Sequence, residues 1–235
     1  MLFRSVRGNA SQGNGNGVLN TMAASLLVHG AQFEDNADEL GHGGGVLNMG
    51  MLTVQYSTFN GNVTDASGGA ISNMGGVVDV VNSTFDDNAS PWGGSVLDNS
   101  GEGQVSFLFS TIGNSDSPNT GAAILVSSGQ VILKNSIVAD TFGDNCIEDG
   151  GTIAVIGDNL STDTTCPGFT LTADPALEPL SVWFPSPTPT LSLGLGSAAI
   201  DASTDCTDFM GAAVDIDQRG APRAPGTCDL GAHEQ

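Results

Sequence analysis

The chain has 235 residues, which is long enough to bury a hydrophobic core in one large domain or two small ones. Its 26 acidic side chains outnumber its 5 basic ones, and the resulting net charge of -21 repels nucleic-acid phosphates and anionic lipids. Nucleic-acid partners are therefore excluded, and because the sequence has no apolar stretch of about 18 residues, so is a membrane span.

The composition favours an all-β protein with many short strands. The 33 glycines, and an excess of Asp over Glu, disfavour helices and favour turns. Hydrophobic residues still make up 39% of the chain, and they stand in short runs between clusters of Gly, Asn and Ser. That pattern is typical of short strands separated by turns.

One pattern returns about every 26 residues, beginning near the start of the chain. An apolar anchor is followed three positions later by Asn or another small polar residue. The steps between successive anchors are 27, 26, 26, 27 and 25 residues, which is the period range of solenoids. The copies are Val6–Asn9, Phe33–Asn36, Phe59–Asn62, Phe85–Asn88, Ile112–Ser115 and Ile137–Asp140.

A second element advances in step with the first. It is a pair of small residues before an aliphatic one, as in Gly68-Gly69-Ala70-Ile71. Two residues after each aliphatic position comes a polar residue, which predicts a second corner of the coil. This second polar file contains Asn20, Asn48, Asn73 and Asp98.

A period near 26 residues suits one coil of a parallel β-helix, because it is too short for a propeller blade and contains no helical half. Three short strands complete each coil, and successive coils stack about 4.8 Å apart. We therefore predict a β-helix of about six or seven coils, of 25 to 28 residues each, over residues 1–169. Its expected structural ladders are an apolar stack of Phe33, Phe59, Phe85, Ile112 and Ile137 and an amide ladder of Asn36, Asn62 and Asn88.

The C-terminal part carries an ordered series of motifs, while Gly68–Asn88 is the clearest single copy of the repeat. The motifs are Gly196–Asp201 (GSAAID), Cys206, Asp217–Arg223 (DQRGAPR) and Cys228–Glu234 (CDLGAHE). The repeats resemble those of bacterial polymorphic outer-membrane proteins, within the pectin-lyase-like right-handed parallel β-helix superfamily. The motif series resembles the closing segment of the choice-of-anchor Q family of secreted bacterial β-helix proteins.

The resemblance implies a right-handed β-helix, export from the cytoplasm, and attachment to the cell surface through a variable C-terminal anchor. The sequence departs from this pattern at both ends, since it starts inside a coil at Met1 and stops at Gln235 without a sorting tail. We accordingly expect the N-terminus to be truncated.

Residues 170–235 are predicted to form an irregular C-terminal cap and return segment packed on the β-helix. The repeat decays after Ile153, prolines follow at positions 175, 185, 187 and 189, and the open end of a solenoid needs covering. Arg219 and Arg223 are expected to bind carboxylates such as Asp215 or Asp229, or to cap strand carbonyls.

Four cysteines lie in this last part of the chain and form no C-x-x-C pair, which favours disulfides in an oxidising compartment. The preferred pairing is Cys146–Cys166 and Cys206–Cys228, because each bond closes a loop of about 20 residues. Two other connectivities remain open.

Motifs for catalysis and metal binding are scarce. His29, His42 and His233 have no metal-ligand spacing, and no cofactor fingerprint occurs, so we expect no cofactor. The acidic turns allow at most weak surface binding of calcium, since calcium-loop spacings are absent. Lyase chemistry on polyanionic pectin is disfavoured, because Arg4, Arg7 and Lys134 are the only basic residues of the repeat region.

Glycoside hydrolysis needs only two carboxylates at a suitable separation. Glu34 and Asp35 follow one anchor, and Asp86 and Asp87 follow another two coils later, about 9.6 Å away. That separation lies near the upper limit for an inverting hydrolase. The preferred interpretation is that these acids are solvated turn residues that keep the solenoid soluble.

The sequence thus predicts a non-enzymatic protein that is extracellular or displayed on a bacterial cell surface. We expect a rigid acidic spacer or adhesin that contacts extracellular glycans or cell-surface proteins, with Trp92 and Trp183 as candidates for stacking on sugar rings. One alternative is a glycan-active hydrolase using the four carboxylates above. Another is a structural subunit that assembles end to end into filaments.

Overall fold

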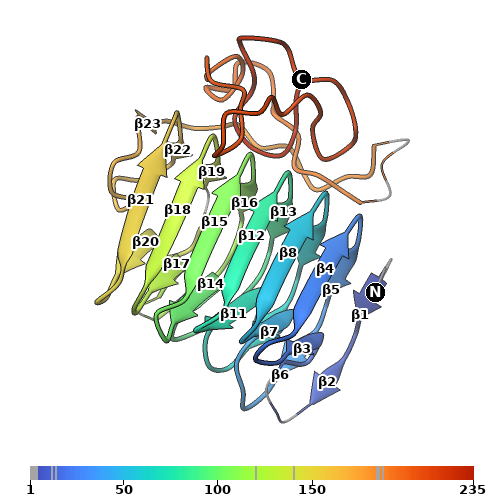
Figure 1. Ribbon diagram of the computed structural model, residues 1–235, viewed down its shortest axis with the longest axis vertical. Coiled ribbons are helices and arrows are strands. Elements are labelled where there is room, and N and C mark those ends of the chain that lie inside the picture. The colour runs from blue at the N-terminus through green and yellow to red at the C-terminus, as the bar shows by residue number, and fades with distance from the viewer. Residues whose placement is uncertain are drawn as a thin grey trace.

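A computed structural model describes residues 5–11, 13, 15–119, 121–139, 141–183, 186 and 188–235 of the chain. The described residues form strands and turns without a helix, wound into a parallel β-solenoid of about six turns. This confirms the predicted parallel β-helix (Figure 1).

Three long sheets run along the solenoid, and all their strand pairs are parallel. The eight-stranded sheet contains β1 (Ser5–Arg7), β5 (Gln32–Glu34), β9 (Thr58–Asn60), β13 (Thr84–Asp86), β16 (Thr111–Gly113), β19 (Ile137–Val138), β22 (Leu160–Ser161) and β23 (Leu171–Thr172). The front sheet of Figure 1 contains β4 (Ser25–His29), β8 (Met51–Gln55), β12 (Val77–Val81), β15 (Gln104–Leu108), β18 (Gln130–Lys134) and β21 (Thr152–Ile156). The third sheet contains β3 (Val18–Asn20), β7 (Val46–Asn48), β11 (Ile71–Met74), β14 (Gly94–Ser100), β17 (Ala122–Val126) and β20 (Asp144–Glu148). A short fourth sheet joins β2 (Ala10–Ser11), β6 (Ala37–Asp38) and β10 (Val63–Thr64).

The predicted phenylalanine stack forms the centre of the core. Phe33, Phe59 and Phe85 are register partners on successive coils and are fully buried. Their ring centroids are 4.5 Å apart for the first pair and 5.1 Å for the second, with nearly parallel planes. Burial of each ring contributes on the order of 2 kcal/mol to folding.

The apolar stack continues through Ile112, which pairs with Phe85, but its next member differs from the prediction. Ile112 pairs with Val138, while Ile137 pairs with Thr111 on the outer side of the strand. The sequence step chosen for Ile137 was one residue short, and side chains alternate faces along a strand, so the neighbouring residue points inward. Ile137 is buried instead in a separate cluster with Leu193 and Leu230.

Two amide ladders run along corners of the solenoid. In the predicted ladder, Asn36 Nδ2 donates to Asn62 Oδ1 at 2.8 Å and Asn62 Nδ2 donates to Asn88 Oδ1 at 2.9 Å. The second ladder joins Asn20, Asn48 and Asn73 as expected, but its next member is Asn99. Asp98 was expected there, and an irregularity in the register of β14 after Gly94 shifts this strand by one residue.

The C-terminal end of the solenoid is closed by the loop between β22 and β23. The Cys146–Cys166 disulfide joins this loop to β20, and Phe169 packs against the end of the core. Side chains of Asp163 and Thr165 accept hydrogen bonds from the backbone N–H groups of Asn145 and Cys146. These contacts satisfy edge groups that would otherwise be open to pairing with another strand.

The remainder of the chain, residues 174–235, runs back along the side of the solenoid over the ends of the strands (Figure 1). We call it the return segment. Within its described residues it has isolated bridges but no strand, and the Cys206–Cys228 disulfide closes its last part. Both disulfides therefore have the preferred pairing.

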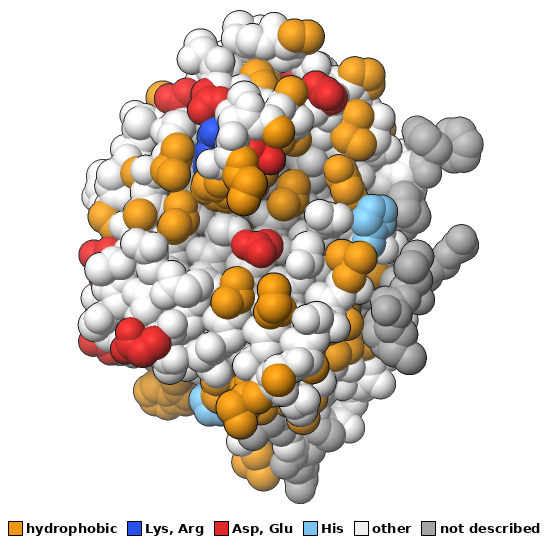
Figure 2. Space-filling view, viewed as in Figure 1, with side chains coloured by type: hydrophobic (Ala, Val, Ile, Leu, Met, Phe, Trp, Pro, Cys, Tyr) orange, Lys and Arg blue, Asp and Glu red, His pale blue; other side chains and the backbone are white. Residues whose placement is uncertain are grey.

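The front sheet presents a flat outer face. Figure 2 shows that acidic side chains on this face are few and are separated by hydrophobic and uncharged ones. The exposed hydrophobic residues of its strands include Leu27, Met51, Val77 and Ile156. In the described part of the chain there is no helix long and apolar enough to cross a membrane.

Candidate functional site

The return segment is held by a repeated Ser-Thr pair that was not recognised in the sequence. This pair stands just before three of the apolar anchors, as Ser57-Thr58, Ser83-Thr84 and Ser110-Thr111. The Ser83 hydroxyl accepts from the backbone N–H of Ser57 on the preceding coil, and the Ser83 and Ser110 hydroxyls donate to carbonyls of their own corners. The threonines point outward, and all three bond the return segment.

A row of corner residues with positive φ lies beside these threonines. Tyr56, Asn82, Phe109 and Asn135 have φ between 45° and 52°. At such a φ the side chain leaves the corner at an unusual angle, and Asn tolerates it better than most residues. Asn82 Nδ2 donates to the backbone oxygen of Ile216, and Asn135 Nδ2 donates to that of Asp205. The row is therefore the docking line of the return segment.

The two C-terminal sequence motifs form the part of the return segment that packs against this row of corner residues. We call them the clasp, residues Asp217–Arg223 and Cys228–Gln235. Gln218 is buried between coils, where its Nε2 donates to Thr58 Oγ1 at 3.0 Å and its Oε1 accepts from Thr84 Oγ1 at 2.7 Å. The amide thereby ties two coils to the clasp.

Arg223 is the central buried charge of the clasp. Its Nη1 donates to Glu234 Oε2 at 3.0 Å, and its Nη2 donates to Asn82 Oδ1 at 2.9 Å. Its guanidinium lies 4.1 Å above the centre of the Phe109 ring, a cation–π contact with the solenoid. It also donates to the backbone oxygens of Asp229 and Gly231, which lie within the clasp and outside the strands, whereas carbonyls of strands were expected.

Asp217 and Glu234 are the carboxylates that complete the clasp. Asp217 accepts from Arg219 Nε at 2.7 Å and from the backbone N–H groups of Arg219 and Ala221. Burial raises the pKa of Glu234, and the neighbouring Arg223 acts against that rise. The expected carboxylate partners, Asp215 and Asp229, are thus replaced by Asp217 and Glu234.

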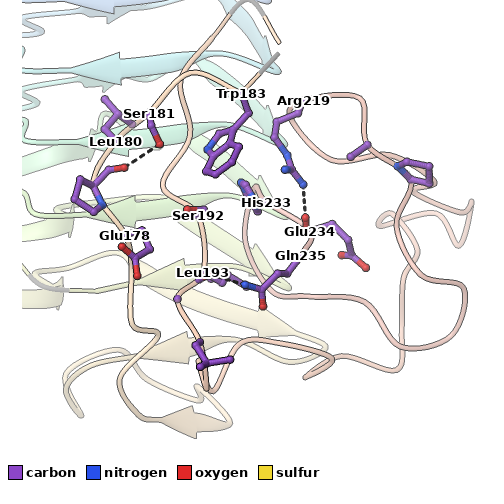
Figure 3. A pocket seen from close by; sticks show the side chains of 15 residues that line it. Glu178, Leu180, Ser181, Trp183, Ser192, Leu193, Arg219, His233, Glu234 and Gln235 are labelled. Atoms are coloured by element: carbon purple, nitrogen blue, oxygen red, sulfur yellow. Dashed lines mark hydrogen bonds between the residues drawn. The ribbon is translucent and has the colours of Figure 1, made fainter. Parts of the chain in front are cut away.

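A hollow of about 770 Å³ lies beside the clasp. It is an open groove, and Figure 3 shows its walls. The segment Glu178–Trp183 forms one side, Ser192–Leu195 forms the floor, and Arg219 and His233–Gln235 form the other side. We call it the Trp183 groove.

Trp183 and His233 meet inside this groove. The indole is 44% exposed, and the imidazole packs edge-on against it with ring centroids 5.8 Å apart. Burial, followed by the positive charges of Arg219 and Arg223, lowers the pKa of His233 to about 4. The imidazole is therefore neutral at neutral pH and positions the indole without adding charge.

A smaller hollow of about 360 Å³ adjoins the groove across Glu178, Pro179 and Leu180, which line both. Its other wall is the edge of the solenoid, where Asp86 and Asp87 lie. Asp86 accepts a hydrogen bond of 2.8 Å from Asn114 Nδ2. Burial is the main cause that raises the pKa of Asp86, and repulsion from Asp87 adds to it.

Of the four carboxylates considered for hydrolysis, Asp86 and Asp87 line the smaller hollow, Glu34 lines another, and Asp35 lines neither. Glu34 lies with Arg7 in a third hollow of about 280 Å³, and its Oε2 is 2.8 Å from Arg7 Nε. Glu34 and Asp86 are register partners on either side of Asn60, so they are two strand spacings, about 9.6 Å, apart along the sheet. Asp35 has a positive φ of 54° and Asp87 one of 53° in the turns.

The other aromatic candidate lies elsewhere. Trp92 is 65% exposed, and none of the hollows described above includes it. Among the described residues, no group of three or more His, Cys, Asp or Glu side chains could hold a metal ion.

No protein-family model, curated protein or solved structure matches this chain. The candidate site therefore stands on its geometry.

Proposed function

We propose that this protein is an exported bacterial surface protein whose rigid acidic β-helix presents the Trp183 groove to an extracellular glycan. The observation that carries the proposal is the half-exposed indole inside the 770 Å³ groove, where His233 packs edge-on against it. The apolar face of a sugar ring stacks on such an indole. The two disulfides fit an oxidising location outside the cytoplasm.

Polar groups around the indole suit the hydroxyls of a sugar. Ser181, Ser192 and Gln235 line the groove together with Glu178. Ser181 and Ser192 can each donate and accept hydrogen bonds, and Glu178 supplies acceptor oxygens. A groove of about 770 Å³ lies within the size range of small-molecule sites.

The proposal is glycan binding and not glycan hydrolysis, because the carboxylates are already bonded to other side chains of the protein. Glu34 is paired with Arg7, Asp86 is bonded to Asn114, and Glu234 is held by Arg223. A general acid and a general base need access to one substrate bond from two sides, and these groups lie in separate places. The closed C-terminal end likewise supports a binding role over end-to-end filament growth.

A glycan array followed by calorimetry on the purified chain tests the proposal. We expect binding to a defined set of oligosaccharides and a loss of at least about tenfold in affinity in Trp183→Ala, because the stacking platform is removed. Trp92→Ala is the matched control, since it deletes an exposed indole outside the hollow and should leave affinity unchanged. Equal loss in both variants, or no glycan bound by the parent protein, would contradict the proposal.

A reducing-sugar assay on every glycan that binds separates binding from hydrolysis. We expect no release of reducing ends by the parent protein. Release that disappears in Asp86→Asn or Glu34→Gln would establish the hydrolase instead.

A further inference from the structure

The charges around the Trp183 groove restrict which sugars it can hold. Each basic side chain in the described part of the chain is already paired with a carboxylate of the protein itself. The pairs are Arg7–Glu34, Lys134–Asp205, Arg219–Asp217 and Arg223–Glu234. The described surface thus offers no unpaired cation to a uronate or a sialic acid, and the net charge of -21 repels both.

Arg219 is the one arginine or lysine that lines the groove, and its Nε and Nη2 are already bonded within the protein. Its Nε lies 2.7 Å from Asp217 Oδ2, its Nη2 lies 2.7 Å from the same oxygen, and Nη2 also bonds the backbone oxygen of Glu234. Figure 3 shows this last bond closing one wall of the groove. Moving the guanidinium toward an anionic ligand would break the contacts that hold the clasp turn together.

The carboxylates beside the groove, unlike the basic side chains, are not all paired. Glu178 is exposed on the lip shared by the groove and the adjoining hollow, and it has no ion pair among the described residues. Across that lip lie Asp86 and Asp87, which repel each other. A ligand lying from Trp183 across Glu178 therefore meets an indole face first and then three carboxylates.

An indole face and carboxylates both attract ammonium groups. We propose that the groove and the adjoining hollow together bind a sugar chain that carries protonated amino groups, such as an oligomer of glucosamine. One sugar ring stacks on Trp183, and amino groups of this ring and the next pair with Glu178 and with Asp86 or Asp87. This inference rests on the proposed glycan-binding function and specifies the class of ligand.

Calorimetry on the full chain with three tetrasaccharides tests the inference. The ligands are the tetramer of glucosamine, the same tetramer fully N-acetylated, and the tetramer of galacturonic acid. We expect the glucosamine tetramer to bind at least about tenfold more tightly than the N-acetylated one, with an affinity that falls as salt is added, and the galacturonate tetramer not to bind.

Two variants locate the binding. Glu178→Gln should weaken binding of the glucosamine tetramer about fivefold, since one exposed ion pair is lost. It should change the weaker binding of the N-acetylated tetramer by less than about twofold, because glutamine keeps an oxygen that can accept from a sugar hydroxyl. Glu102→Gln is the matched control, because it removes the same charge from an exposed turn outside the groove and should have no effect. Trp183→Ala should weaken binding of both tetramers.

The possible failures are distinguishable. Equal affinity for the two amino-sugar tetramers, with Glu178→Gln unchanged, would overturn the ammonium inference and leave the glycan-binding function standing. A lysine tetrapeptide that binds as tightly as the glucosamine tetramer, with no loss in Trp183→Ala, would show general attraction to an acidic surface and would also overturn it. Absence of binding to any glycan would overturn the proposed function itself.

Discussion

Arg223 and Arg7 show how differently two arginine–glutamate pairs act in one molecule. Arg223 is buried, bonds four groups of the protein and stacks on Phe109, whereas the side chain of Arg7 is 53% exposed and pairs with Glu34. Exposed pairs contribute little to stability, while removal of one member of a buried pair leaves an uncompensated charge. The motif that contains Arg223 is thus explained by attachment of the return segment.

The two arginines give a matched test of this difference. Arg223→Ala should lower the free energy of unfolding by about 3–5 kcal/mol, because the carboxylate of Glu234 stays buried without its partner. Arg7→Ala should lower it by less than about 1 kcal/mol. Urea denaturation followed by circular dichroism measures both, and a loss below about 1 kcal/mol in Arg223→Ala would contradict the assigned role.

At the scale of the strand and its corner, the ladders are what the sequence predicts best. The steps near 26 residues place Phe33, Phe59 and Phe85 in register because any other winding would expose their rings. The Asn ladder follows for a related reason, since an amide can donate to the coil on one side and accept from the coil on the other.

Asn62 has such bonds on both sides. Its Nδ2 donates to Asn88 Oδ1 and to the backbone oxygen of Phe33, and its Oδ1 accepts from Asn36. Asn62→Ala should therefore cost about 2–3 kcal/mol of stability, because buried polar groups of two neighbouring coils lose their partners.

Asn60→Ala is the control, on the outer face of β9 just before the corner that contains Asn62, and it should change the free energy of unfolding by less than about 0.5 kcal/mol. Thermal and urea denaturation of the two variants measure the difference. Equal effects would mean that the ladder adds nothing beyond ordinary side-chain packing.

Other parts of the fold and of the site could not be predicted from the repeat. The placement of Asp98 in the second file failed by one residue because of the irregularity in β14. The placement of Ile137 in the stack failed by one residue because Ile137 and Val138 are both apolar, and composition alone does not tell which of two neighbouring residues faces inward. The Ser-Thr pair was visible as a repeat, but its meaning depends on the return segment, which has no period. The groove at Trp183 joins residues far apart in the chain, and no spacing encodes that.

At the scale of the whole molecule, the two disulfides serve different parts. Cys146–Cys166 holds the loop that closes the C-terminal end, and Cys206–Cys228 holds the return segment beside the clasp. Each closes a loop of about 20 residues, which corresponds to roughly 3 kcal/mol in the chain-entropy description.

Removing each bond should consequently loosen a different region. We expect Cys206→Ser with Cys228→Ser to speed amide hydrogen exchange in the return segment, for example at Ser203 and Val214, while β12 and β15 stay protected. Cys146→Ser with Cys166→Ser should instead speed exchange in β20 and in the closing loop. Uniform acceleration over the whole chain in either double variant would show that the solenoid and return segment open only together.

The side-on course of the return segment also limits how such a chain can evolve. Repeat proteins ordinarily gain and lose units by duplication, because each unit touches only its neighbours. Here the return segment forms hydrogen bonds with four consecutive coils, at Thr58, Thr84, Thr111 and Asn135. A coil duplicated among these four would move the later hydrogen-bonding positions by about 4.8 Å along the solenoid. A unit added ahead of β5 would meet no such obstacle, and growth in length is therefore confined to the end of the solenoid opposite its disulfide-closed one.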